Sequence, residues 1–268
     1  MIFLTPKEYS NMEKRLEGKT AIIIGSDAGI GQSTAIALAR DGANVAISYL
    51  YDEDGAQQTF HQVKQHGQRA LVIQADTSDE EQVEALFDSA IREFGQLYIL
   101  VHIAGMGAAG TKVAELPTER WRDAFATNVD SCFFCARRFV NHRLEKGGNG
   151  KIIHITPVQQ QVTRAGAADY ECTKGAILNL SRILALEVAE YGICVNNLVP
   201  GMVHLPYIQE EQSRLEARAA ELQRIPLKRA ARPEEIAKLA HFLASPDSDY
   251  CSGATYTMDG ALSLGPVA

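Results

Sequence analysis

Residues 20–31 decide the fold and read Thr20-Ala21-Ile22-Ile23-Ile24-Gly25-Ser26-Asp27-Ala28-Gly29-Ile30-Gly31. The first five form a short apolar run rich in β-branched side chains, which predicts a buried strand. The three glycines permit a tight turn in which backbone N–H groups can approach a pyrophosphate, and the residues that follow predict a helix whose positive end faces that anion. The stretch therefore predicts a phosphate-binding turn between a first strand and a first helix.

Similar apolar runs recur along the chain, separated by segments of helical pattern. This alternation predicts βαβ units and a mostly parallel sheet. An alternating chain of this size is also compatible with a (β/α)8 barrel, but the Gly-rich turn after the first strand argues against that fold. The six further strands are expected at Asn44–Tyr49, Arg69–Gln74, Gln96–Ile103, Lys151–Ile155, Cys194–Val199 and Ala254–Met258.

The helices between the strands show apolar residues at spacings of three and four, which predicts amphipathic helices that cover the sheet. One such helix reaches Ala189, and another has Pro233 in its first turn, where the missing N–H costs nothing. The polar segment Leu205–Ile225 predicts a helical insertion that could act as a lid. We expect an N-terminal extension over residues 1–18 and a single domain over residues 19–268, since no repeat or Gly/Ser linker interrupts the series.

Composition excludes several classes of protein. The 268 residues carry 26 Lys and Arg against 33 Asp and Glu, for a formal net charge of −7, and no basic run appears, so a nucleic-acid partner is not expected. No stretch is apolar for long enough to cross a membrane, and the apolar N-terminus is too short for a signal peptide. The five scattered cysteines indicate free thiols in a reducing compartment, so we expect a cytoplasmic protein.

Several motifs in chain order resemble the short-chain dehydrogenase/reductase family, and the resemblance runs from Lys19 to Gly260. It implies a single doubly wound Rossmann-type domain with a seven-stranded parallel sheet flanked by helices, assembled as a homotetramer or dimer. The motifs are the turn Gly25, Gly29, Gly31; Asp76-Thr77 after the third strand; Ala104-Gly105 after the fourth; Asn128 in a long helix; Tyr170 and Lys174; Pro200-Gly201 after the sixth strand; and Met258-Asp259-Gly260.

Tyr170 and Lys174 are four residues apart at the start of a predicted helix, so their side chains leave the same face. Reduction of a carbonyl needs a proton donor at the oxygen, and the reverse oxidation needs a base. A neighbouring ammonium and a nicotinamide cation both favour the phenolate of a tyrosine, whose ordinary pKa is about 10. The resemblance implies that Tyr170 is the acid/base, that Lys174 also holds the nicotinamide ribose, and that Asn128 holds a water in a proton relay.

The resemblance also implies NAD or NADP as cofactor and a small-molecule carbonyl or alcohol as substrate: a sugar, polyol, ketone or oxoacyl compound. NAD is favoured because Tyr49 is followed by acidic residues and no cation stands in the turn near Asp27. No metal site is expected, and His102 and His154 are interpreted as packing residues. The implied cofactor-binding residues are Gly25, Asp27, Gly29, Ile30, Gly31, Tyr49, Asp76, Thr77, Ala104, Gly105, Tyr170, Lys174, Pro200, Gly201 and Val203.

The chain departs from the family pattern at Pro157, which stands 13 residues before Tyr170, where the family has a serine that binds the substrate oxygen. Loss of one such donor typically costs about 10²–10³ in turnover. Thr156, Gln159, Gln160 or His154 could supply a donor instead. Further departures are His102-Ile103 in place of two asparagines and Leu205 in place of a threonine. These changes leave an alternative open, a dinucleotide-binding protein with weakened catalysis.

Overall fold

Seven parallel strands form one sheet in the order β3-β2-β1-β4-β5-β6-β7. The structure is a computed structural model, and it describes residues 14–158, 163–204 and 222–265. The chain runs outward from β1 to β3, then returns to the other side of β1 with β4. The strands are β1 Thr20–Ile24, β2 Asn44–Tyr49, β3 Ala70–Gln74, β4 Ile99–His102, β5 Gly150–Ile155, β6 Ile193–Pro200 and β7 Thr255–Met258.

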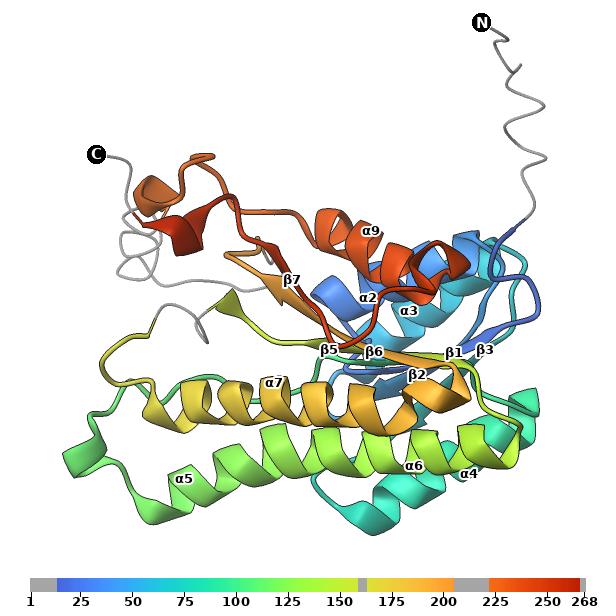
Figure 1. Ribbon diagram of the computed structural model, residues 1–268, viewed down its shortest axis with the longest axis horizontal. Helices are drawn as coiled ribbons and strands as arrows, with labels where there is room; N and C mark the ends of the chain where they lie inside the picture. Colours follow the sequence, from blue (N-terminus) through green and yellow to red (C-terminus); the bar gives the residue numbers. More distant parts are fainter. Residues whose placement is uncertain (1–13, 159–162, 205–221, 266–268) are drawn as a thin grey trace, which may run out of the picture.

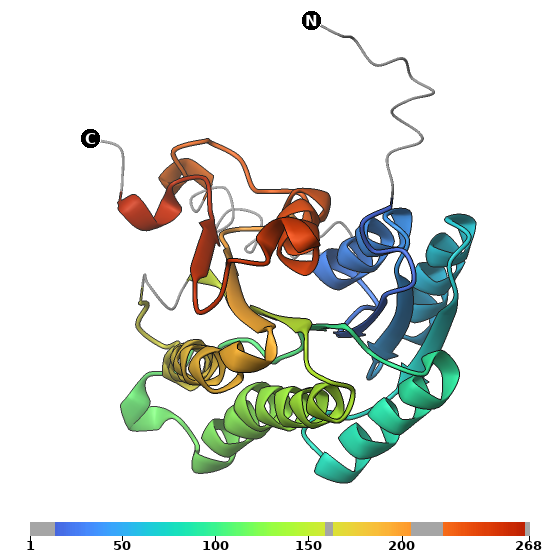
Figure 2. The same ribbon diagram turned by 45° about the vertical axis from the view of Figure 1, so that its right-hand side comes forward.

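Helices cover both faces of the sheet, which makes three layers (Figures 1 and 2). One face carries α2 Gly29–Arg40, α3 Glu53–Gln65 and α9 Pro233–Ala244, and the other carries α4 Glu80–Phe94, α6 Ser131–Glu145 and α7 Ala168–Val188. The fold is therefore the expected doubly wound α/β domain. The shorter elements are α5 Thr118–Phe125, η1 Val113–Glu115, η2 Ala126–Asp130, η4 Ala189–Tyr191, η5 Pro246–Ser248 and η6 Leu262–Leu264.

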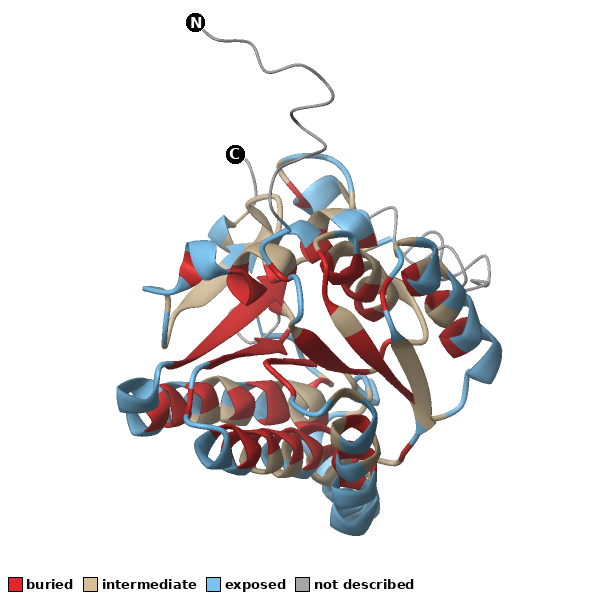
Figure 3. Cartoon of the chain, turned by 90° about the vertical axis from the view of Figure 1, so that its right-hand side faces the viewer, coloured by how far each residue is buried: buried red, intermediate tan, exposed pale blue. Residues whose placement is uncertain are grey.

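The central strands are buried on both faces, which explains their continuous apolar runs (Figure 3). Successive side chains point to opposite faces, so neighbours in one strand belong to different cores. Ile23 packs with the α2 and α9 layer, whereas Ile22 packs with the α4, α6 and α7 layer. Both residues are fully buried.

Most predicted strand ends lie within a residue or two of the observed ones. The bounds of β4 and β6 differ from the prediction. β4 spans Ile99–His102 rather than Gln96–Ile103, although Tyr98 N and Ile103 N still donate to β1 carbonyls. β6 continues to Pro200, since a proline at a strand end loses no required donor.

Two other sequence predictions concern the helices. Pro233 begins α9 as expected. α7 ends at Val188, one residue before the predicted end, and the 3₁₀ turn η4, Ala189–Tyr191, follows it directly. Most of the predicted insertion, residues 205–221, lies outside the described residues; residues 222–224 are helical.

Free thiols were expected, and all five cysteines are free. A search of the described residues finds no helix that is both long and apolar enough to span a membrane.

Candidate active site

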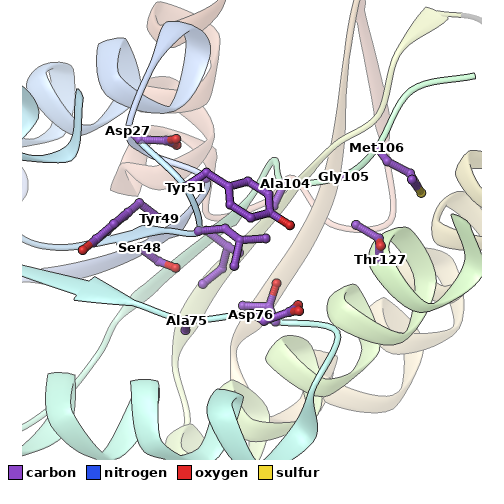
Figure 4. Close-up of a pocket in the computed structure, with 14 residues that line it drawn as sticks. Asp27, Ser48, Tyr49, Tyr51, Ala75, Asp76, Ala104, Gly105, Met106 and Thr127 are labelled. Atoms are coloured by element: carbon purple, nitrogen blue, oxygen red, sulfur yellow. The ribbon is translucent and has the colours of Figure 1, made fainter. Parts of the chain in front are cut away.

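A pocket of about 450 Å³ opens at the carboxyl ends of β1, β2, β3 and β4. The strand order reverses between β1 and β4, and the crevice at such a reversal is where doubly wound sheets bind ligands. In Figure 4, Asp27, Tyr49 and Tyr51 lie on one side of the pocket and Met106 and Thr127 on the other. The lining residues are Ile24, Gly25, Asp27, Ser48, Tyr49, Leu50, Tyr51, Ala75, Asp76, Thr77, Ala104, Gly105, Met106 and Thr127.

The glycine turn at the pocket leaves no room for side chains. Gly25 has φ +81°, and a Cβ at Gly31 would overlap the carbonyl oxygen of Gly25. Gly29 has φ +55°, a left-handed backbone that glycine adopts without strain. The turn therefore needs glycine at all three positions of the predicted motif, and it brings the backbone close to the pocket.

The helix that starts at this turn has no capping side chain. Ala28 stands at its N-cap position, and its first turn holds no acidic residue. By contrast, the Asp52 and Asp79 side chains accept backbone hydrogen bonds at the starts of α3 and α4. The first amides of a helix otherwise need an outside acceptor. The start of α2 therefore fits an anion, such as the pyrophosphate of a dinucleotide.

Asp27 lines the pocket, and the Asp52 carboxylate lies near it. Burial and the neighbouring Asp52 carboxylate raise the pKa of Asp27 above its usual value, with burial the larger cause. None of the residues that line the described pocket is a lysine or an arginine. The pocket therefore lacks the cation that a 2′-phosphate would require.

Tyr170 and Lys174 lie on adjacent turns of α7. The Lys174 Nζ atom is 5.5 Å from the centroid of the Tyr170 ring. Lys174 is 4% exposed, and a Cβ at the pocket residue Gly105 would lie 3.0 Å from its Nζ atom. An ammonium held beside the pocket in this way fits the hydroxyls of a cofactor ribose.

Burial shifts the pKa values of both Lys174 and Tyr170. It lowers the pKa of Lys174 to about 8, with a small opposing effect from Cys132. It also raises the pKa of Tyr170 to about 12, against a lowering influence of Arg164. Tyr170 is therefore a protonated phenol at neutral pH, and the expected lowering of its pKa needs a further positive charge nearby.

Asn128 lies in η2, a π-helical turn between α5 and α6. Single π turns within helices are frequent at functional sites. The fully buried Asn128 side chain accepts from Met106 N at 2.8 Å and donates to Thr173 Oγ1 at 2.9 Å. A Cβ at Gly105 would lie 2.6 Å from Asn128 Oδ1 and 3.0 Å from Lys174 Nζ. Glycine at position 105 therefore lets the chain after β4 pass close to Asn128 and Lys174.

The position of the expected serine carries no donor. Pro157 is partly exposed, and the preceding Thr156 is fully buried with its hydroxyl unpartnered. His154 is also buried, and its Nδ1 is hydrogen-bonded to Ser181 Oγ at 2.6 Å. Neither Thr156 nor His154 therefore presents a donor at the surface, and Gln159 and Gln160 lie outside the described residues.

The structure brings many of the predicted site residues together. The pocket gathers Gly25, Asp27, Tyr49, Asp76, Thr77, Ala104 and Gly105. The remaining ones are not part of its lining: Gly29, Ile30 and Gly31 begin α2, Asn128 lies in η2, Tyr170 and Lys174 lie on α7, Pro200 ends β6, Gly201 follows it, and Val203 bridges to Ala231.

Sequence reasoning missed seven pocket residues: Ile24, Ser48, Leu50, Tyr51, Ala75, Met106 and Thr127. Each directly adjoins, or lies two residues from, a residue that it did single out. Across the described ranges, no group of three or more His, Cys, Asp or Glu side chains could hold a metal ion.

The sheet order and the pocket at its reversal define the class of doubly wound dinucleotide-binding proteins. A family model described as Enoyl-(Acyl carrier protein) reductase matches residues 24–263. Glucose 1-dehydrogenase 2 of Bacillus subtilis is 35% identical over 255 residues, which cover 95% of this chain and 98% of the relative. 3beta-hydroxysteroid dehydrogenase 1 of Eggerthella lenta is 36% identical over 251 residues, covering 94% and 96%.

Solved structures agree with these relatives. The acetoin dehydrogenase from Enterobacter cloacae matches with a TM-score of 0.83 and 32% identity, over 92% of this chain and 96% of that one. The chain belongs to the short-chain dehydrogenase/reductase family. It is therefore an oxidoreductase that acts on alcohol or carbonyl substrates, in a family that generally uses NAD or NADP.

Proposed function

We propose that this protein interconverts a carbonyl compound and a secondary alcohol with NAD(H) as cofactor and Tyr170 as acid/base. The observation that carries the proposal is the largely buried Lys174, whose ammonium lies next to the Tyr170 ring on α7. The glycine turn at the start of α2 supports it, since its uncapped amides fit a pyrophosphate. We also propose that residues 19–268 act as one domain.

Each residue of the pair has a distinct role in this proposal. The bound nicotinamide supplies or accepts the hydride. Tyr170 donates its phenolic proton to the carbonyl oxygen in reduction and takes it back in oxidation. Lys174 binds the ribose and, when protonated, favours the phenolate. Asn128 fixes the chain at Met106 and forms part of the path by which the tyrosine proton is replaced.

NAD(H) is proposed over NADP(H) because Asp27 and Asp52 place negative charge at the adenosine end of the pocket. The proposed substrates are small hydroxy or carbonyl compounds such as sugars, polyols, hydroxysteroids and hydroxyketones. The names of the relatives, which include glucose, hydroxysteroid and acetoin dehydrogenases, support this range. A cytoplasmic homotetramer or dimer is proposed from the family resemblance.

One observation favours a second candidate function, a dinucleotide-binding protein with weakened catalysis. The expected hydroxyl donor is replaced by Pro157, and the neighbouring Thr156 hydroxyl is buried. A donor to the developing alkoxide contributes about 3–4 kcal/mol of transition-state stabilisation. The chain keeps Tyr170, Lys174 and Asn128 of the family pattern, which favours the active enzyme over the weakened protein.

Titration with NADH and NADPH, followed by turnover measurements with the oxidised cofactors for the alcohols and the reduced cofactors for the carbonyl compounds, tests the two functions. The substrate panel comprises D-glucose, a 3β-hydroxysteroid, acetoin, diacetyl and a series of polyols. The active enzyme predicts NADH binding together with turnover of at least one panel member. Binding without turnover on any of them would favour the weakened protein, and absence of binding would refute both.

A further inference from the structure

Asp169, the residue directly before Tyr170, is a fully buried carboxylate to which the proposed reaction gives no role. It accepts hydrogen bonds from Arg120 Nε at 2.9 Å, from Ala109 N at 3.0 Å and from Tyr170 N at 3.0 Å. Burial of a carboxylate is costly unless donors replace its water. The three donors come from three segments, so one side chain joins the start of α7 to two other parts of the chain.

One of those segments begins at the pocket and spans residues 105–110, which we call the wall. It reads Gly-Met-Gly-Ala-Ala-Gly, a composition with little conformational preference of its own. Gly105 and Met106 line the pocket. The Asn128 side chain holds the near end of this wall through both backbone groups of Met106, at 2.8 and 3.2 Å. Asp169 holds the far end through Ala109 N.

Arg120, in the first turn of α5, also holds the wall. We call the contacts of Asp169 and Arg120 with the wall the clamp. Its guanidinium donates to the Asp169 carboxylate through Nε and to the Gly107 carbonyl through Nη2. A planar guanidinium can reach two acceptors at once, which a lysine ammonium on a single stem does less well. Gly166, just before α7, also lies against the wall, because a Cβ there would meet the Gly110 carbonyl carbon at 2.9 Å.

We propose that Asp169 is a positioning residue that acts with Arg120. Together they hold the Gly107–Ala109 part of the wall at a fixed place relative to the Tyr170 hydroxyl. The proposal rests on the proposed function of Tyr170. These residues continue directly from Gly105 and Met106, which line the pocket, and a displacement of about 1 Å at a reacting group can cost 10²-fold in rate. The glycine content of the wall makes that displacement easy once the clamp is lost.

Two variants test the clamp in the full-length protein. Asp169→Asn keeps the size of the side chain and removes its charge, whereas Arg120→Lys keeps the charge and removes the planar fork. Arg138→Gln is a matched control, because Arg138 is 16% exposed and pairs with Glu84 and Asp88 on the surface between α4 and α6. Arg120 is comparably placed, at 27% exposed.

Hydrogen–deuterium exchange measures the wall directly and needs no substrate. We expect exchange in a peptide covering Gly107–Gly110 to accelerate at least tenfold in both clamp variants, with α9 peptides unchanged and with the control at the wild-type rate. For any panel substrate that the wild type oxidises or reduces, kcat should fall at least tenfold while the NADH Kd stays within threefold. The double variant should be no worse than the poorer single variant, since the two residues act as a unit.

Three results would overturn the proposal: wild-type exchange in both clamp variants, accelerated exchange with unchanged kcat, or an equal loss of kcat in Arg138→Gln. If Asp169→Asn fails to fold, the Arg120→Lys substitution at the partly exposed Arg120 decides alone. A wild-type protein that binds NADH but turns over no panel member in either direction would count against the proposed function instead. The exchange rate of the wall would then decide the existence of the clamp by itself.

Discussion

His102 and His154 lie side by side on adjacent strands, with their ring centroids 6.3 Å apart and the rings nearly perpendicular. Both are buried, which lowers the pKa of each, and the positive charge of Lys174 lowers both further. Each has a hydroxyl partner from a covering helix, Ser131 for His102 at 2.9 Å and Ser181 for His154 at 2.6 Å. Burial, followed by the nearby positive charge of Lys174, lowers the pKa of His154 to about 4. The pair is therefore neutral in the folded protein at neutral pH.

The first prediction is a loss of stability in acid that originates in this pair. Between pH 6.5 and about 4 the unfolded chain binds a proton at His154 that the folded protein does not, so stability falls as the pH falls, by up to about 1.4 kcal/mol per pH unit. Urea unfolding at pH 7 and pH 5 measures it. His154→Gln should lose about 2 kcal/mol less than the wild type over that interval.

His61→Gln is the control, because His61 is an exposed histidine on α3. It should leave the pH dependence of the unfolding free energy unchanged. Equal losses between pH 7 and pH 5 in the wild type and His154→Gln would show that His154 takes no part in the acid sensitivity.

The second prediction concerns Tyr170. Tyr170→Phe keeps the packing of the ring and removes the proton donor, so turnover should fall more than tenfold while the NADH Kd changes by less than about threefold. Steady-state rates and fluorescence titration measure the two effects. Retention of more than a tenth of the wild-type turnover would remove Tyr170 from the mechanism.

The same residue predicts opposite pH profiles for the two directions. Burial holds the pKa of Tyr170 at about 12 in the cofactor-free protein, and bound oxidised cofactor should lower it. Oxidation of an alcohol needs the phenolate and should accelerate as the pH rises toward that pKa. Reduction needs the phenol and should not gain from rising pH. A reduction rate that climbs with pH in parallel with oxidation would contradict this assignment.

The third prediction concerns the choice of cofactor. NADH should bind more tightly than NADPH, because the Asp27 and Asp52 carboxylates repel a 2′-phosphate. Asp27→Asn removes one of these charges and should improve NADPH binding relative to NADH by about fivefold, on the order of 1 kcal/mol for a charge pair at the partly buried Asp27. Asp123→Asn, an exposed residue of α5, is the charge-matched control. Tighter binding of NADPH by the wild type would refute the preference.

The fold followed from the sequence because its signals are local. β1 and β2 were predicted to the residue, since each is a β-branched run that ends at a polar or glycine-rich turn. The glycine pattern also correctly predicted a turn between the first strand and the first helix. The π turn that carries Asn128 was not predictable, because it has the same apolar spacing as the α-helices on either side of it.

The candidate site was only partly predictable for a different reason. Seven of the predicted cofactor residues line the pocket at or near strand ends, where parallel strands bring distant segments to one edge. The contacts of Asp169 with Arg120 and of His102 with His154 join residues far apart in the chain. No spacing rule anticipates such contacts, although the position of Asp169 next to Tyr170 was visible. Tyr51 is 90% exposed at the pocket mouth, and only the course of the chain after β2 places it there.

The last prediction concerns Pro157, where the chain departs from its family. Pro157→Ser should supply the missing donor to the developing alkoxide, because the position is partly exposed while the Thr156 hydroxyl is buried. Turnover should rise by about 10–10³-fold, up to the cost of deleting one such donor. Stability should fall by about 0.4–1 kcal/mol, since serine restores freedom to the unfolded chain.

Pro157→Ala separates the two effects, because it makes the same change in backbone freedom without adding a hydroxyl. Kinetics and thermal melts of the three proteins on one substrate panel give the comparison. A gain in turnover for serine and none for alanine would assign the effect to the hydroxyl, and an equal gain for both would assign it to release of the proline backbone. Unchanged turnover in both variants would mean that another group already binds the substrate oxygen, whereas inactivity of all three would favour the weakened dinucleotide-binding protein.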